Sequence, residues 1–127
     1  MRVITPLHNQ LAERFAAWLR TAGYQDIEHE RDHVDVRFRS KDRSYCAELK
    51  VCHGFSTRAA IREALGQITE YNLYDEDELP ADEWWIVLDE EPGAADLRYA
   101  TRLRREFGLP LFLVFPVRGG AAFIAAR

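Results

Sequence analysis

Two neighbouring segments, HVDVRFR (residues 33–39) and SYCAELKVC (residues 44–52), decide the fold because both alternate apolar and polar residues. A period of two is typical of β-strands whose faces meet different surroundings. Residues 40–43 predict a short turn that joins the strands as an antiparallel hairpin. In the register of that hairpin, Asp35 lies directly opposite Glu48.

The other elements follow from apolar periodicity and from the residues that break it. Apolar residues recur at helical spacing in three segments, and two further runs are continuously apolar, as in strands covered on both faces. In chain order we predict helix 6–22, edge strand 24–30, strands 33–39 and 44–52, helix 56–74, strand 84–88, helix 95–107 and strand 109–117, followed by a short piece at 121–126. This order, α-β-β-β-α-β-α-β, predicts an α/β (α+β-like) fold with a mixed central sheet flanked by helices.

Length and composition predict one domain, residues 1–127, because 127 residues that are 47% hydrophobic suffice for a single core. No apolar run approaches the roughly 20 residues that span a bilayer, and no secretory signal opens the chain, so we expect a cytoplasmic protein. Cys46 and Cys52 lie in one predicted strand, too far apart to pair. Both are expected to be reduced.

The net charge of −4 argues against a general coat for nucleic acid, so any surface that contacts DNA must be a local patch. The hairpin carries four candidates for phosphate contacts: Arg37, Arg39, Lys41 and Arg43. Solvated charges would give the same pattern. Residues 75–83 hold six acids and a proline and predict a solvated loop.

The hairpin register brings together the candidate reaction centre. Opposed side chains on one face have Cβ atoms about 5 Å apart, so the carboxylates of Asp35 and Glu48 would repel each other unless a cation bridged them. Lys50 lies two residues further along the same face, where it can orient a water molecule or stabilise a phosphate. With the backbone carbonyl of Leu49, the ligands are all oxygen, which suits Mg²⁺ or Mn²⁺.

The alternative interpretation is an ordinary solvated sheet face. On that interpretation the same residues form exposed cross-strand pairs, such as Glu48 with Arg37. Such pairs contribute only about 0.2–1 kcal/mol. The two strands alone do not distinguish this alternative from a reaction centre.

The pattern Asp35…Glu48-Leu49-Lys50 resembles the D…(D/E)-x-K signature of the PD-(D/E)XK nucleases, the restriction-endonuclease-like superfamily. The next helix adds to this likeness, since IREALGQITEY (residues 61–71) resembles the A-x-GQ-x-x-EY helix of several branches. The predicted element order is also that of the family core. The resemblance therefore covers residues 6–117.

The resemblance implies roles for residues outside the hairpin. In those branches the glutamine and the tyrosine of the helix border the metal site, which implies Gln67 as a catalytic residue that positions Lys50 or the water, and Tyr71 at the rim. His8 and Asn9 are similar to a His-Asn pair that opens the first helix of some small relatives. They are further candidates for the rim of the site.

The sequence departs from the family pattern at two places. Many members carry a metal-binding glutamate in the first helix, near the position that Ala12 occupies here; Glu13 is one residue away and points opposite the apolar stripe. No proline precedes Asp35. The first departure leaves open whether one metal ion binds or two.

The resemblance implies a nuclease that hydrolyses DNA phosphodiester bonds, with Mg²⁺ or Mn²⁺ held by Asp35 and Glu48, and Lys50 beside the attacking water. The chain is too short for a separate recognition domain, so a homodimer or a larger protein partner would supply specificity. RNA remains an alternative substrate. The alternative function is a catalytically weak or inactive module that binds nucleic acid or protein in a defence or repair complex.

Overall fold

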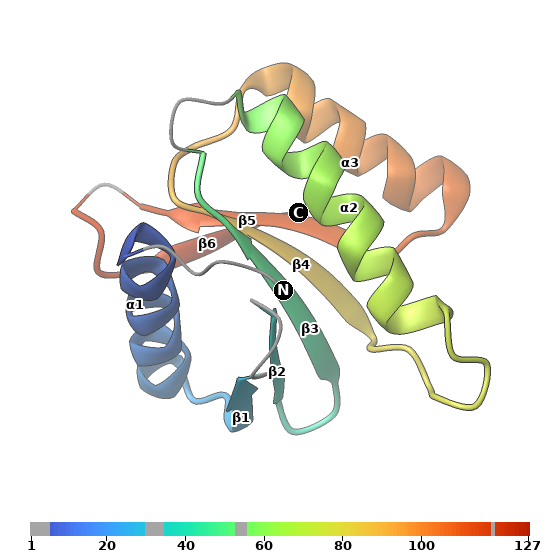
Figure 1. Ribbon diagram of the computed structural model, residues 1–127, viewed down its shortest axis with the longest axis horizontal. Coiled ribbons are helices and arrows are strands. Elements are labelled where there is room, and N and C mark those ends of the chain that lie inside the picture. Colours follow the sequence, from blue (N-terminus) through green and yellow to red (C-terminus); the bar gives the residue numbers. More distant parts are fainter. Residues whose placement is uncertain (1–5, 30–34, 53–55, 118) are drawn as a thin grey trace.

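The computed structural model describes residues 6–29, 35–52, 56–117 and 119–127, and combines one mixed six-stranded sheet with three helices (Figure 1). The elements are α1 (Pro6–Ala22), β1 (Gln25–His29), β2 (Asp35–Arg39), β3 (Ser44–Lys50), α2 (Thr57–Leu73), β4 (Glu83–Leu88), α3 (Ala94–Phe107), β5 (Leu111–Pro116) and β6 (Phe123–Ala126). The predicted element order is confirmed, and the short closing piece is a sixth strand. Among the described residues, no helix combines the length and the apolar character needed to cross a bilayer.

The strands follow one another across the sheet in chain order. β1–β2, β2–β3 and β5–β6 pair antiparallel, whereas β3–β4 and β4–β5 pair parallel. The β2–β3 register is the predicted one, with Arg39 opposite Ser44 and Asp35 opposite Glu48. The beginning of the predicted strand 33–39 lies outside the described residues, and β3 ends at Lys50, two residues earlier than expected.

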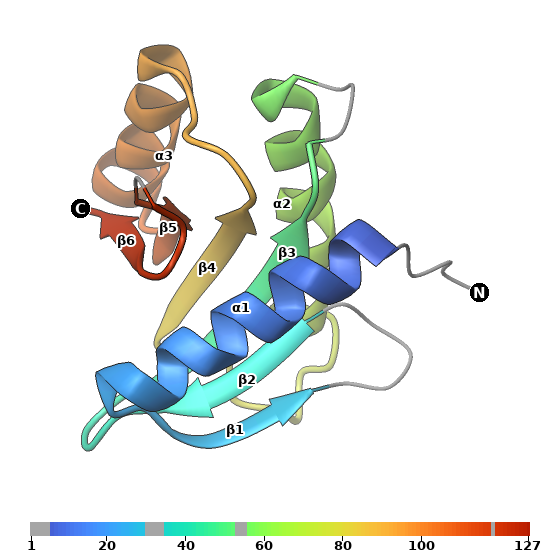
Figure 2. The same cartoon turned by 90° about the vertical axis from the view of Figure 1, so that its left-hand side faces the viewer.

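Helix α1 covers one face of the sheet, as Figure 2 shows. Leu11, Phe15 and Leu19 recur every four residues and are at most 1% exposed, so they form the buried stripe of the helix. They pack against a core that includes Phe38 and Trp85. Burial of each such side chain contributes roughly 1.5–3 kcal/mol, which fixes α1 on this face.

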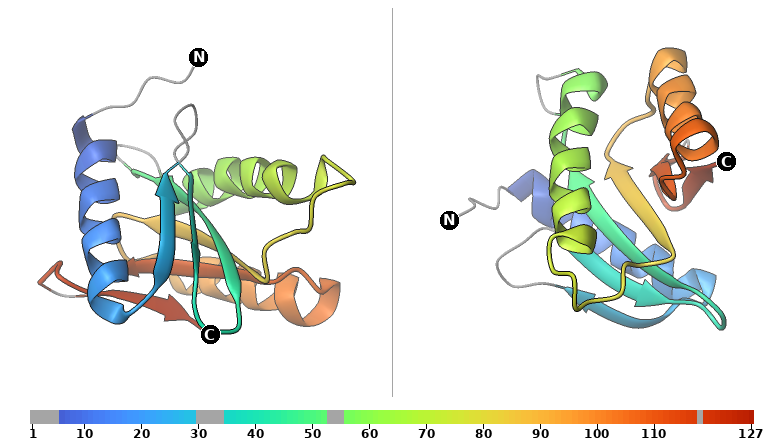
Figure 3. Two further views of the ribbon diagram at one scale, coloured as in Figure 1. Left: turned by 90° about the horizontal axis from the view of Figure 1, so that it is seen from below. Right: turned by 90° about the vertical axis from the view of Figure 1, so that its right-hand side faces the viewer.

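Helices α2 and α3 lie side by side on the opposite face (Figures 1 and 3). Each connects two parallel strands, so both crossovers cover the same surface. α2 begins where predicted, because the Ser56 side chain accepts a hydrogen bond from the backbone N–H of Ala59. Its buried stripe includes Ile61, Ala64 and Ile68. These side chains lie against the face that carries the candidate reaction centre.

The prediction of a solvated acidic loop through residue 83 is wrong at its end. Glu83 is the first residue of β4 and only 5% exposed. The indole N–H of Trp85 donates to its Oε1 at 3.0 Å, and guanidinium nitrogens of Arg127 and Arg43 lie 3.2 and 3.5 Å from its carboxylate. Trp85 lies in β4 itself, Arg43 directly precedes β3 and Arg127 directly follows β6. Together these partners offset the cost of burying the charge.

Candidate functional site

Two acidic side chains of the hairpin face each other inside the protein. Asp35 is the first residue of β2, Glu48 lies in β3, and the two are partners across the antiparallel ladder. Their exposed fractions are 2% and 0%. Since directly opposed residues have Cβ atoms about 5 Å apart, the two carboxylates share one small buried region.

These acids lie on the face of the sheet that α2 covers. Strand alternation puts Cys46, Glu48 and Lys50 on one side of β3, and Cys46 packs in the same core as Ile61 of α2. Lys50 is 8% exposed. The burial of the two acids and the lysine rules out the alternative in which they form a solvated sheet face.

The Lys50 ammonium is held by an acid that the sequence interpretation missed. Its Nζ donates to Oε1 of Glu63, in the second turn of α2, at 2.7 Å. Glu63 precedes Gln67 by four residues, so the two share one side of the helix. That spacing was the available signal, because any acid one turn before Gln67 faces the same strand residues.

Gln67 therefore lies on the side of α2 that contacts Lys50. Its side chain is partly exposed, but its Oε1 is buried and accepts no hydrogen bond within the described part of the chain. Buried polar atoms are nearly always paired, so this amide oxygen is available to a donor such as a water molecule. Tyr71, a further turn along the same side, is partly buried.

The two rim candidates of α1 differ from each other in their surroundings. His8 is partly buried, and its Nε2 atom is inaccessible to solvent. Asn9 is exposed and lines a surface groove of about 340 Å³ with Glu13, Arg20 and His29. Asn9 thus lies beside the groove between α1 and β1. Of the two rim candidates, His8 is the one with a buried polar side-chain atom.

The hairpin cations divide into two groups. Nε of Arg37 lies 3.9 Å from Oδ2 of Asp35, and Arg43 lies near Glu83, so both are directed at acids of the protein. Arg39 and Lys41 are exposed. Among the described residues, these two form no ion pair with a carboxylate.

The atoms gathered around Asp35 and Glu48 suit a hard divalent cation. Both acids offer carboxylate oxygens, and the Leu49 side chain is buried on the α1 face, so that residue can contribute only its backbone carbonyl. The cluster has a formal charge of −1, from three acids and two bases: Asp35, Glu48, Glu63, Arg37 and Lys50. A divalent cation would change this charge to +1.

Cys46 places a buried, uncharged thiol beside the two acids. Burial raises the pKa of its thiol to about 12; Asp35 and Glu48 add to the shift, whereas Arg37 and a hydrogen bond with Asn72 oppose it. The structure describes Cys46 and Cys52 as free, buried thiols. A thiol that stays neutral at physiological pH is a poor metal ligand, so a metal ion on this face would be held by the carboxylates.

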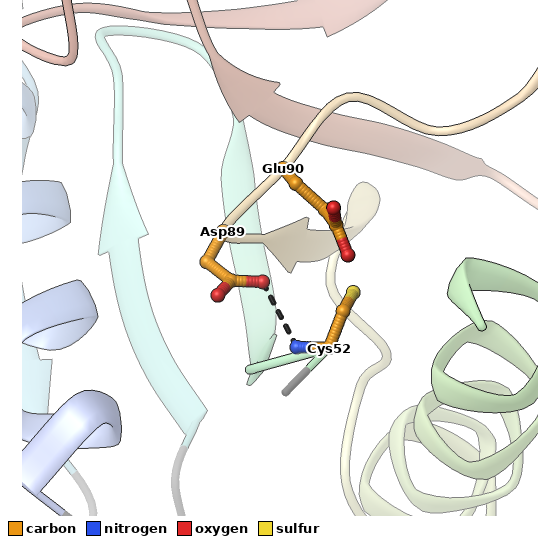
Figure 4. A group of neighbouring side chains, drawn as sticks. All are labelled: Cys52, Asp89 and Glu90. Atoms are coloured by element: carbon orange, nitrogen blue, oxygen red, sulfur yellow. Dashed lines mark hydrogen bonds between the residues drawn. The ribbon is translucent and has the colours of Figure 1, made fainter. Parts of the chain in front are cut away.

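A second acidic group lies at the carboxyl ends of β3 and β4 (Figure 4). One ligand atom each from Cys52, Asp89 and Glu90 lies within 4.8 Å of the others, and the Cys52 N–H donates to Oδ1 of Asp89 at 2.9 Å. Burial and the two carboxylates raise the pKa of the Cys52 thiol to about 12. This shift favours a neutral, hydrogen-bonded thiol over a metal-binding thiolate.

Comparisons with protein-family models, with curated proteins and with solved structures found no match to this chain.

Proposed function

We propose that this protein is a metal-dependent nuclease that hydrolyses DNA phosphodiester bonds, built on a restriction-endonuclease-like core. The observation that carries the proposal is the buried pair Asp35 and Glu48 with Lys50 beside it on the same face. The carboxylates of two opposed buried residues repel each other, and a divalent cation between them would offset the cost of that repulsion. A site that accepts this cost is typical of metal-assisted hydrolysis.

In this proposal Mg²⁺ or Mn²⁺, when bound, lowers the pKa of a coordinated water and polarises the phosphate. Asp35 and Glu48 would hold the ion, and the Leu49 carbonyl would be a further oxygen ligand. Because Lys50 is hydrogen-bonded to the Glu63 carboxylate, it acts as a donor that orients the water or stabilises a phosphate oxygen. Gln67 Oε1 can accept a hydrogen bond from that water and fix its orientation.

Cleavage of defined substrates tests the reaction. The protein is incubated with linear, nicked, branched and single-stranded DNA, and with RNA, in Mg²⁺ or Mn²⁺. We expect products that require the metal and that disappear in Lys50→Ala. Glu76→Gln, in the exposed loop after α2, is the control and should cleave at the wild-type rate. Products that persist in Lys50→Ala would contradict the assignment.

Metal binding is tested separately by calorimetric titration with Mn²⁺. Wild type and Glu76→Gln should bind the ion, whereas Glu48→Gln and Asp35→Asn should not, since each loses one of the two carboxylates. If the metal binds as expected but none of the substrates is cut, the alternative of an inactive binding module replaces the nuclease. If Glu48→Gln binds Mn²⁺ as well as wild type does, the proposed metal site is wrong.

A further inference from the structure

A pocket of about 410 Å³ lies between α2 and α3, on the side of α2 away from the reaction centre. Figure 3 shows the two helices side by side. Arg58, which lines the pocket, precedes Gln67 by nine residues, or about two and a half turns, so the two residues lie on opposite sides of the α-helix. The pocket is therefore separate from the cluster around Asp35. Its lining comprises Arg58, Ile61, Arg62, Ala95, Asp96 and Tyr99.

The pocket is locally cationic in a protein whose net charge is −4. Arg58 and Arg62 are one helical turn apart, so their guanidinium groups extend from the same side of α2. Both are exposed, and neither forms an ion pair with a carboxylate of the described segments. Arginine pairs of this kind suit the planar recognition of phosphate oxygens.

The one acid in the lining is already occupied. Oδ2 of Asp96 accepts hydrogen bonds from the Thr57 hydroxyl and from the backbone N–H of Gly93, at the start of α3. These bonds hold its carboxylate against the helix end instead of against the arginines. With two bases and one acid, the formal charge of the lining is +1.

The remaining lining residues are mainly apolar. Ile61 is 2% exposed and belongs to the core, Ala95 adds a small surface, and Tyr99 is 45% exposed. An accessible aromatic ring beside arginines offers a stacking surface for a base together with donors for its phosphate. The volume is also within the range of roughly 300–1,000 Å³ that is usual for small-ligand pockets.

We propose that this pocket binds a nucleotide unit, with the phosphate held by Arg58 and Arg62 and the base against Tyr99. The same chemistry is presented by a free nucleotide and by one unit of a nucleic-acid strand. The proposal does not depend on the reaction centre, because no residue of the Asp35 cluster lines the pocket.

Binding is measured without divalent metal, on the full chain carrying Glu48→Gln and in the presence of EDTA, so that cleavage cannot interfere. The probes are adenosine monophosphate and inorganic phosphate by calorimetry, and a labelled oligothymidine by fluorescence anisotropy. We expect the nucleotide or the oligonucleotide to bind with a Kd below about 1 mM. Inorganic phosphate should bind more weakly, because it has no base.

Arg58→Ala and Arg62→Ala should each weaken binding about tenfold, since each removes a charged hydrogen-bond donor. Tyr99→Leu should weaken binding of the nucleotide and leave binding of inorganic phosphate unchanged. Arg20→Ala, an exposed arginine of α1, is the matched control. Circular dichroism confirms that each variant is folded.

Binding of the oligonucleotide alone would identify a nucleic-acid strand as the ligand. Binding of the mononucleotide alone would identify a free nucleotide as the ligand. The proposal fails if neither the mononucleotide nor the oligonucleotide binds at about 1 mM, or if Arg58→Ala and Arg62→Ala bind as tightly as wild type. A separate Mn²⁺ titration of Arg58→Ala, in a protein that keeps Glu48, tells failure of the nucleotide pocket apart from failure of the metal site. That titration should match wild type.

Discussion

Nζ of Lys50 lies 2.7 Å from Oε1 of Glu63, a contact that joins the end of β3 to the second turn of α2. The two partners differ in exposure, with side-chain fractions of 10% for Lys50 and 66% for Glu63. Because Glu63 is mostly solvated, the pair contributes little to stability, about 1 kcal/mol or less. Its main consequence is geometric, since it fixes the position of a buried amine beside two buried acids.

Glu63→Ala should therefore impair catalysis far more than folding. We expect kcat to fall about tenfold, which corresponds to about 1.4 kcal/mol of lost transition-state stabilisation, with KM unchanged. Glu63→Gln should retain part of the activity, because its amide oxygen accepts the same hydrogen bond. Steady-state cleavage kinetics test this, with Glu76→Ala as control. An unchanged kcat in Glu63→Ala would show that the contact has no role in positioning Lys50.

Glu48→Gln should stabilise the metal-free protein. The substitution removes the repulsion between two buried carboxylates, so we expect the free energy of unfolding to rise by about 1 kcal/mol. Mn²⁺ at a hundredfold excess over its Kd should stabilise wild type by about 2.7 kcal/mol, on the order of 10 °C in Tm, and leave Glu48→Gln unaffected. Thermal unfolding with and without Mn²⁺ measures both effects. A lower metal-free Tm in Glu48→Gln would indicate that the carboxylate is stabilised by the protein alone.

Asn72 should be a structural residue of the α2 end. It is 3% exposed, its Nδ2 donates to the Ile68 carbonyl at 2.8 Å, and its Oδ1 accepts from the Ala81 N–H at 2.9 Å. Asn72→Ala leaves that buried N–H without its acceptor, which should cost about 2–3 kcal/mol. Urea denaturation measures the loss, with Gln10→Ala at an exposed position of α1 as control. A loss below about 0.5 kcal/mol would show that water replaces the side chain.

Stability should decrease at alkaline pH because of the two buried thiols. Burial raises the pKa of Cys46 and Cys52 from 9.0 to about 12. Above pH 9 the unfolded chain loses these protons while the folded protein keeps them, so the free energy of unfolding falls as pH rises. The decrease should reach about 1.4 kcal/mol per pH unit for each thiol in the window from pH 9 to 12.

Urea denaturation at a series of pH values measures this slope. The variant with Cys46→Ala and Cys52→Ala should start from a lower stability, since two buried side chains are truncated. Its slope between pH 9 and 12 should nevertheless be shallower than that of wild type. Equal slopes would mean that other groups cause the alkaline loss.

Much of the candidate site could be predicted from the sequence because its register is local. The alternation in β2 and β3 and the length of the turn between them are enough to set Asp35 opposite Glu48 and to put Lys50 on the same face. The order of the elements follows in the same way, since hydrophobic periodicity reflects which face of each segment is buried. The proposed nuclease activity remains a prediction.

Tertiary structure alone decided which charges meet. Glu63 approaches Lys50 only because α2 packs across β3, and buried Glu83 pairs with Arg43 and Arg127, which are 40 or more residues away along the chain. A sequence pattern records the neighbours one strand or one helical turn away. Contacts between elements depend on how those elements pack, so the amino-acid sequence determined the acids and their register, and the packing of α2 determined the partner of the amine beside them.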